Sequence, residues 1–130
     1  MTRGRAWACA AGCVAALAVG GCRGDNPEEG VAYTVATGGN ATNGRIVIEY
    51  RNCGTCHTIP GVRNARGLVA PPLFWFSRRT FIAGEVPNTP ENLVQWVRSP
   101  QSIEPRTAMP TLGLSEQEAR DVAAYLYTLR

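Results

Sequence analysis

Five consecutive residues, Cys53-Gly54-Thr55-Cys56-His57, bring together two thiols and the only histidine of the chain. On a helical turn, Cys53 and Cys56 stand three residues apart and His57 stands four residues after Cys53, so the three side chains project from one side. This C-x-x-C-H spacing is the attachment pattern of c-type haem. The thiols can reach two edge vinyl groups of a porphyrin while the imidazole binds the iron as the proximal ligand.

Three other kinds of site use similar residues. A thioredoxin-like dithiol also shows C-x-x-C, but it belongs to a βαβ setting that this sequence does not indicate. A structural zinc site needs four ligands, whereas only three nitrogen and sulfur candidates stand here and no second C-x-x-C follows. A disulfide between Cys53 and Cys56 is compatible with the spacing. Haem attachment is favoured because an export signal and a second iron ligand accompany the motif.

The second iron ligand is found by elimination. The chain contains no other histidine and no lysine, and its two methionines are Met1 and Met109. Met1 belongs to a segment that is expected to be removed, so Met109 remains. A lone methionine more often fills a gap in an apolar core, but Met109 stands between Pro105 and Pro110 rather than on an apolar stripe, which favours ligation. A Met/His pair raises the reduction potential of haem iron.

Two helices that would position these residues have clear start signals. Ser115 and Glu118 form a capping box, and the apolar stripe that follows consists of Ala119, Val122, Ala123, Leu126 and Leu129. A second helix is predicted to start at Thr89-Pro90, because proline is well tolerated in the first turn, and to end before Pro100.

A third element covers Gly44–Asn52. Its β-branched residues allow a strand as well as a helix, and the helix is favoured. As a helix it places Ile46, Tyr50 and Cys53 on one face.

The N-terminal segment has the layout of a secretory signal. Two arginines within residues 1–5 precede an uncharged stretch, residues 6–19, which is shorter than the roughly 20 residues of a membrane-spanning helix. Small residues directly before Cys22 resemble the lipobox of bacterial lipoproteins. We therefore expect residues 1–21 to be a lipoprotein signal peptide and Cys22 to be lipidated, which places the chain on the periplasmic side of the cell envelope. An uncleaved anchor helix is the alternative.

Residues 22–42 show no apolar periodicity and are expected to form a flexible tether, followed by one domain at residues 43–130. The 130 residues, 45% of them apolar, suit one small folded domain and exclude a doubly wound sheet or a (β/α) barrel. The net charge of +3 is too small for a dedicated nucleic-acid binder. Residues 58–88 are rich in glycine and proline, and their order is expected to depend on a buried non-protein group.

The order of these features resembles that of class I cytochromes c: C-x-x-C-H, then a Pro-Leu segment, a loop methionine and a C-terminal helix. Further similarity is to the cytochrome c domains associated with haem–copper terminal oxidases. The stretches that carry this second resemblance are residues 88–93, Trp96, Pro100-Gln101, Met109-Pro110 and Tyr125-Leu126.

The resemblance implies an all-α fold of three to five short helices around one covalent haem c, with long Pro/Gly-rich loops. It makes Cys53 and Cys56 the thioether attachments, His57 the proximal ligand and Met109 the distal ligand. The carbonyl of Pro71 would accept a hydrogen bond from the His57 ring, which fixes the imidazole.

Three more residues receive roles with alternatives. The resemblance implies that Trp96 packs against the haem, although a plain core position is equally compatible. Arg78 and Arg79 are candidates to pair with the haem propionates, because the guanidinium fork suits carboxylates. The alternative is that both arginines are solvated surface residues.

Iron held on both faces leaves one-electron transfer rather than enzyme catalysis. The expected partners are a terminal oxidase or its electron donor, with the membrane reached through the N-terminal lipid. Residues 45–80 contain six arginines and one acid, so this half is expected to dock on an acidic partner. If Met109 does not ligate, a five-coordinate haem would give a peroxidase or gas sensor. A structural subunit of an oxidase complex is a third possibility.

Overall fold

The computed structural model describes residues 36–130. Its helices are α2 (Ala41–Tyr50), α3 (Pro90–Arg98) and α4 (Glu116–Tyr127), and its single 3₁₀ turns are η1 (Cys53–Thr55), η2 (Phe76–Arg78) and η3 (Pro100–Ser102). Strands β1 (Phe81–Ile82) and β2 (Val86–Pro87) pair as a short antiparallel hairpin. The expected signal peptide, Cys22 and most of the expected tether lie outside the described residues.

Both predicted helix starts are confirmed. The Ser115 hydroxyl accepts a hydrogen bond from the Glu118 amide at 3.2 Å, and the Glu118 carboxylate accepts one from the Ser115 amide at 2.8 Å. This Ser115 amide, together with the Arg51 guanidinium, lowers the pKa of Glu118 to about 2. Helix α3 begins with Thr89 as its cap, whose hydroxyl accepts from the Asn92 amide, and with Pro90 in its first turn.

The third element is a helix rather than a strand. It begins at Ala41, earlier than expected, because the Asn40 side chain caps it by accepting a hydrogen bond from the Asn43 amide. The face expected to carry Ile46 and Tyr50 is the outer one, with these side chains 53% and 75% exposed. Gly44 and Ile48 form the buried face instead.

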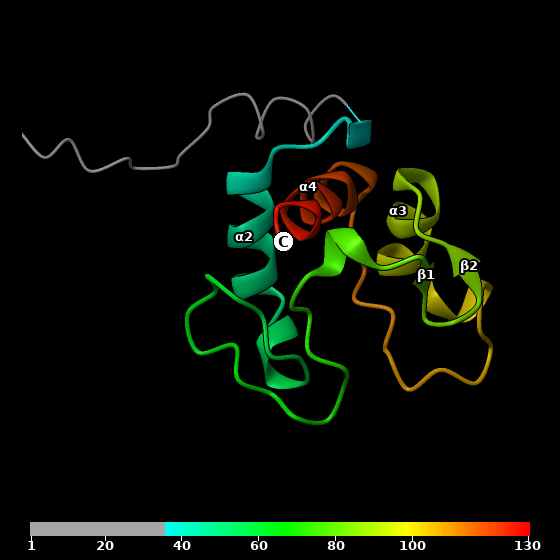
Figure 1. Ribbon diagram of the computed structural model, residues 1–130, viewed down its shortest axis with the longest axis horizontal. Helices are drawn as coiled ribbons and strands as arrows, with labels where there is room; N and C mark the ends of the chain where they lie inside the picture. The colour runs from blue at the N-terminus through cyan, green and yellow to red at the C-terminus, as the bar shows by residue number, and fades with distance from the viewer. Residues whose placement is uncertain (1–35) are drawn as a thin grey trace, which may run out of the picture.

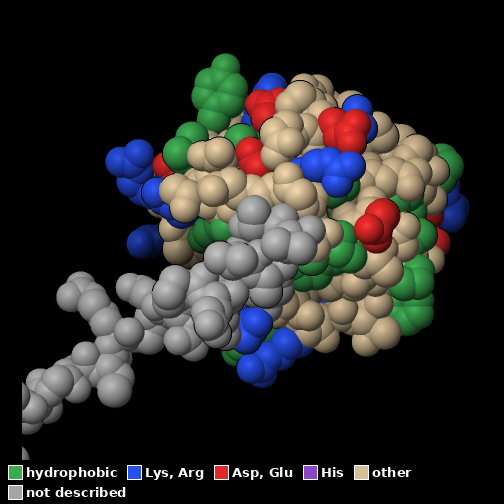
Figure 2. Space-filling view, turned by 90° about the horizontal axis from the view of Figure 1, so that it is seen from above, with side chains coloured by type: hydrophobic (Ala, Val, Ile, Leu, Met, Phe, Trp, Pro, Cys, Tyr) green, Lys and Arg blue, Asp and Glu red, His purple; other side chains and the backbone are tan. Residues whose placement is uncertain are grey.

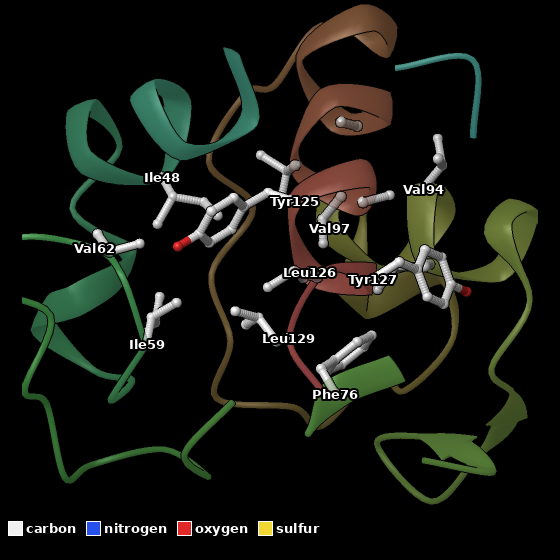
Figure 3. Packing of buried hydrophobic residues seen from close by; sticks show 14 of the residues in the cluster. Ile48, Ile59, Val62, Phe76, Val94, Val97, Tyr125, Leu126, Tyr127 and Leu129 are labelled. Carbon is white, nitrogen blue, oxygen red and sulfur yellow. The ribbon is translucent and has the colours of Figure 1, made fainter. Parts of the chain in front are cut away.

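Helix α4 lies between α2 and α3 (Figure 1) and packs against both. Most of its residues are buried, including the whole predicted stripe together with Leu129 beyond its end. Figure 3 shows Tyr125 on the side of Ile48 and Val62, and Phe76 beside Tyr127. The Tyr125 hydroxyl donates to the Pro60 carbonyl at 2.6 Å, which attaches the Gly/Pro-rich segment to α4.

The folded part begins before residue 43. Residues 37–42, the last residues of the expected tether, belong to the folded domain instead. Thr37 is 1% exposed, and its carbonyl accepts a hydrogen bond from the Arg120 guanidinium at 3.0 Å. The Asn40 amide donates to the buried carboxylate of Asp121 at 2.7 Å. These contacts bind the chain before α2 to the side of α4.

The expected all-α class holds, with one addition, since the described residues are mostly helical but also contain the hairpin. It pairs Phe81 with Pro87 and Ile82 with Val86. Each strand has two residues, too few for an alternating pattern to show in the sequence. Within residues 36–130, no helix has the length and apolar character needed to cross a lipid bilayer.

Candidate functional site

The C-x-x-C-H residues form one tight turn directly after α2. The His57 amide donates to the Cys53 carbonyl at 3.0 Å, and the Gly67 amide donates to the Gly54 carbonyl at 2.9 Å. Gly54 is required by close packing, because a Cβ there would lie 2.5 Å from the Cα of Ala65. The motif is therefore held by the loop that returns to it.

The imidazole of His57 is oriented by the backbone of Pro71. Its Nδ1 lies 2.7 Å from the Pro71 carbonyl oxygen, which can only accept a hydrogen bond, so Nδ1 carries the proton. Nε2 is then the nitrogen with a free lone pair, as a metal ligand requires. This is the contact that the family resemblance implies for Pro71.

One apolar cavity collects side chains from α2, α3, α4 and the loops between them. It is partly open to solvent and has a volume of about 70 Å³, smaller than the roughly 300–1,000 Å³ of small-molecule and cofactor sites. His57, Cys53, Met109 and Trp96 all lie on its wall. The remaining lining residues are apolar: Ile48, Ile59, Leu73, Phe76, Leu93, Val97, Leu112, Leu114, Val122 and Leu126.

The donor set fits a haem group. The wall presents one imidazole and one thioether from segments far apart in the chain, surrounded by hydrocarbon, and the cysteine thiol stands at the same wall. The nitrogen and sulfur atoms are suitable ligands for haem iron, and the apolar wall suits the porphyrin ring. Trp96 is half-buried on this wall and also packs against the core, an arrangement compatible with either of its two predicted roles.

Cys53 and Cys56 are both free thiols in the structure, rather than a disulfide. Burial raises the pKa of the Cys53 thiol, so it stays protonated at neutral pH. Cys56 is partly buried but is not on the cavity wall. Among residues 36–130, histidine, cysteine and acidic side chains do not gather in any group of three or more that could hold a metal ion.

The two arginines differ in their surroundings. The Arg79 guanidinium donates to the Pro72 carbonyl and lies 5.3 Å from the ring centre of Phe76, a residue of the cavity wall. Partial burial lowers the pKa of Arg79. Arg78 is exposed. The structure thus brings Arg79 to the outside of the cavity wall and leaves Arg78 in solvent.

Two structural requirements of the site were not predicted. Gly67 packs so closely that a Cβ would lie 2.3 Å from the Thr55 carbonyl oxygen, and Gln101 holds the loop that carries Met109. The glycine could have been suspected, since it follows the motif in a Gly-rich stretch. Gln101 lies in the stretch Pro100-Gln101 that contributes to the family resemblance, but the sequence gives it no role at the site.

A small helical domain with a C-x-x-C-H turn, and with histidine and methionine on one apolar cavity, defines a haem protein of the c type. The family model described as cytochrome c matches residues 41–130. The chain belongs to the cytochrome c family. Membership of this family implies a haem c group and electron transfer.

Relatives are named cytochrome c oxidase subunit 2. The protein from Alkalihalophilus pseudofirmus is 37% identical over 91 residues, which cover 69% of this chain and 26% of the relative. The protein from Bacillus subtilis is 32% identical over 94 residues, with the same shares covered. The chain thus spans about a quarter of the length of these curated relatives. No solved structure matches the chain significantly.

Proposed function

We propose that this protein is a lipid-anchored mono-haem cytochrome c that transfers single electrons in a respiratory chain, to or within a terminal oxidase. The observation that carries the proposal is the meeting of His57 and Met109 on one apolar cavity next to the C-x-x-C-H turn. The relatives named cytochrome c oxidase subunit 2 support the terminal oxidase as partner. The lipid anchor at Cys22 and the periplasmic location rest on the sequence pattern of residues 1–22.

Haem bound in the cavity would supply an iron that is reduced and oxidised by one electron. Cys53 and Cys56 would hold the group through thioether bonds, and His57 would bind the iron through Nε2 while Pro71 keeps its ring in place. Met109 would supply a thioether ligand to the iron. The apolar wall excludes water and disfavours the extra charge of ferric iron.

The propionates of the group need partners at the edge of the site. Of the two candidate arginines, Arg79 is held beside Phe76 at the cavity wall, whereas Arg78 is exposed. A guanidinium at this place would pair with a propionate without a large movement. We therefore assign this role to Arg79 before Arg78.

The absorption spectrum of the purified ferric protein tests the proposal. Methionine ligation is expected to give a sulfur-to-iron charge-transfer band in the near infrared. High-spin features without that band would contradict it and would favour the five-coordinate peroxidase or gas sensor. Intact mass in the same preparation is expected to show one haem, no signal peptide and an acylated Cys22.

The surface beside the site suits an acidic redox partner. Residues 51–84 contain five arginines and no acid. Figure 2 shows acidic side chains beside arginines on the face seen from above, an arrangement found in the pairs Glu116–Arg120 and Glu49–Arg45. Arg66 and Arg78, by contrast, are exposed and form no ion pair with any described residue.

Electron transfer to the partner is expected to slow as ionic strength rises, because docking is steered by these arginines. The measurement is the second-order rate constant with the oxidase that copurifies after mild detergent extraction, between low and physiological salt. Arg66→Gln and Arg78→Gln should each lower the rate at low salt. Arg98→Gln is the control, since Arg98 already faces Glu116 at 3.8 Å. A rate that does not respond to salt would reject the basic docking surface.

A further inference from the structure

The segment that carries Met109 has little backbone support of its own. Between Ala108 and Leu114, no backbone amide or carbonyl is paired with another backbone group in the structure. Met109 is nevertheless directed into the cavity, where it lies half-buried on the wall. Side chains must therefore determine where this segment lies.

One side chain, Gln101, bridges both sides of the Met109–Pro110 bond. Its Nε2 donates to the Met109 carbonyl at 2.7 Å, and its Oε1 accepts from the Thr111 hydroxyl at 2.7 Å. The amide can make these two bonds in only one orientation, because the reverse would set its oxygen against the Met109 carbonyl oxygen. The bridge therefore uses both ends of the glutamine amide.

The backbone around Gln101 is itself well held. Pro100 is almost completely buried, and its carbonyl accepts hydrogen bonds from the amides of Ile103 and Glu104 at 3.1 and 2.9 Å. The neighbouring Ser102 hydroxyl donates to the Ser99 carbonyl at 2.7 Å. The turn η3, and with it Gln101, is thus fixed to the end of α3.

The backbone of Met109 is consequently held at both its polar groups. Its amide donates to the Thr107 hydroxyl at 3.2 Å, its carbonyl accepts from Gln101, and the following Pro110 confines it to extended conformations. With the backbone so constrained, the direction of the Met109 side chain is set as well.

We infer that Gln101 is a positioning residue that holds Met109 closed over the haem iron and thereby controls how readily an external ligand displaces the methionine. This inference rests on the proposed ligation by Met109. Gln101 does not itself contact the haem site, because its side chain is exposed and is absent from the cavity wall. Its effect is on the equilibrium between closed and open forms of the loop.

The test measures the affinity of the ferric haem-loaded protein for imidazole, which competes with Met109 for the iron. Gln101→Met keeps the length of the side chain and removes both hydrogen bonds. We expect it to raise the apparent affinity about tenfold, the change that the loss of one or two ordinary hydrogen bonds gives. The near-infrared sulfur band should persist without imidazole, because the closed form still dominates.

A matched control is Gln117→Met. Gln117 also makes two side-chain hydrogen bonds, to the Gly38 carbonyl and to Asp121, but on α4 away from the Met109 segment. It should lower the melting temperature and leave the imidazole affinity unchanged. Thr111→Val, which removes one of the two bonds of Gln101, should give a smaller increase than Gln101→Met.

The outcomes separate this inference from the proposed function. A wild-type protein without the sulfur band overturns both. A wild-type protein with the band, but with equal imidazole affinities in wild type and Gln101→Met, overturns the positioning role alone, as does an equal rise in Gln117→Met. If Gln101→Met does not fold, Gln101→Glu decides, because its carboxylate can accept from Thr111 but cannot donate to Met109. An affinity equal to that of wild type would then overturn the role.

Discussion

Replacing Met109 by alanine is expected to convert the ferric protein from a low-spin to a high-spin form that binds external ligands readily. No other histidine and no lysine could replace the methionine sulfur as a ligand, since His57 is the sole histidine and the sequence contains no lysine. The sixth position of the iron would then fall to water or to an added ligand. The near-infrared sulfur band should disappear, and imidazole or cyanide should bind without competition.

The reduction potential should fall in the same variant. A thioether is a soft ligand that favours ferrous iron, so its loss favours the ferric form. A decrease on the order of 0.1 V is expected within the roughly 0.8 V range that axial ligands span. Spectroelectrochemical titration of the two proteins measures it.

Leu112→Ala is the control for this substitution. Leu112 comes from the same segment and lines the same cavity, but it has no ligating atom. Either change removes apolar packing at a cost of about 2–5 kcal/mol if the site is well packed. If both variants kept the sulfur band and the wild-type potential, Met109 would be a packing residue and the proposed ligation would be wrong.

The chemistry of this site is recognisable from sequence because it depends on short spacings and scarce residue types. Cys53, Cys56 and His57 lie within one turn, and Met109 follows by elimination from a chain with one histidine and no lysine. The start of α4 at Ser115 is equally local, because a capping box depends on residues only three positions apart. Such features need no knowledge of tertiary contacts.

What the sequence did not reveal depends on contacts between distant residues. Asn40 and Asp121 are 81 positions apart, yet their hydrogen bond helps to fold the chain that was expected to be a tether. The buried face of α2 depends on such contacts as well. Its sequence pattern does not decide the face, and Ile48 rather than Ile46 is buried where α2 packs against α4. The bridge from Gln101 to Met109 likewise appears only once η3 and the loop lie side by side.

The second large effect is expected at Gly44, where helix α2 packs closely against helix α4. Helices α2 and α4 cross so closely there that a Cβ would lie 1.9 Å from the Asp121 carbonyl oxygen and 2.5 Å from its carbon. The obstacle is backbone of α4, which cannot rotate away as a side chain could. Gly44→Ala therefore forces the two helices apart, although Asn40 and Asp121 bind them at this end.

Two opposing effects act on Gly44→Ala, so the sign of the change in the free energy of unfolding shows which one dominates. Alanine in the interior of a helix is favoured over glycine by about 1 kcal/mol, so helix propensity alone predicts a more stable protein. Overpacking against a fixed neighbour costs about 1–3 kcal/mol and sometimes more, and the 1.9 Å approach places Gly44 at the upper end. We expect Gly44→Ala to lower the free energy of unfolding by about 2 kcal/mol or more, measured by urea denaturation.

Thr42→Ala separates the two effects, because Thr42 is exposed on the same helix and its change improves propensity without adding atoms at the crossing. It should stabilise the protein slightly. Since Ile48, one turn after Gly44, lies on the cavity wall, separation of the helices should also loosen the haem site, and Gly44→Ala should raise imidazole affinity where Thr42→Ala does not. If Gly44→Ala were as stable as Thr42→Ala, the helices would not cross as closely as described, and the wall that α2 and α4 share would need another arrangement.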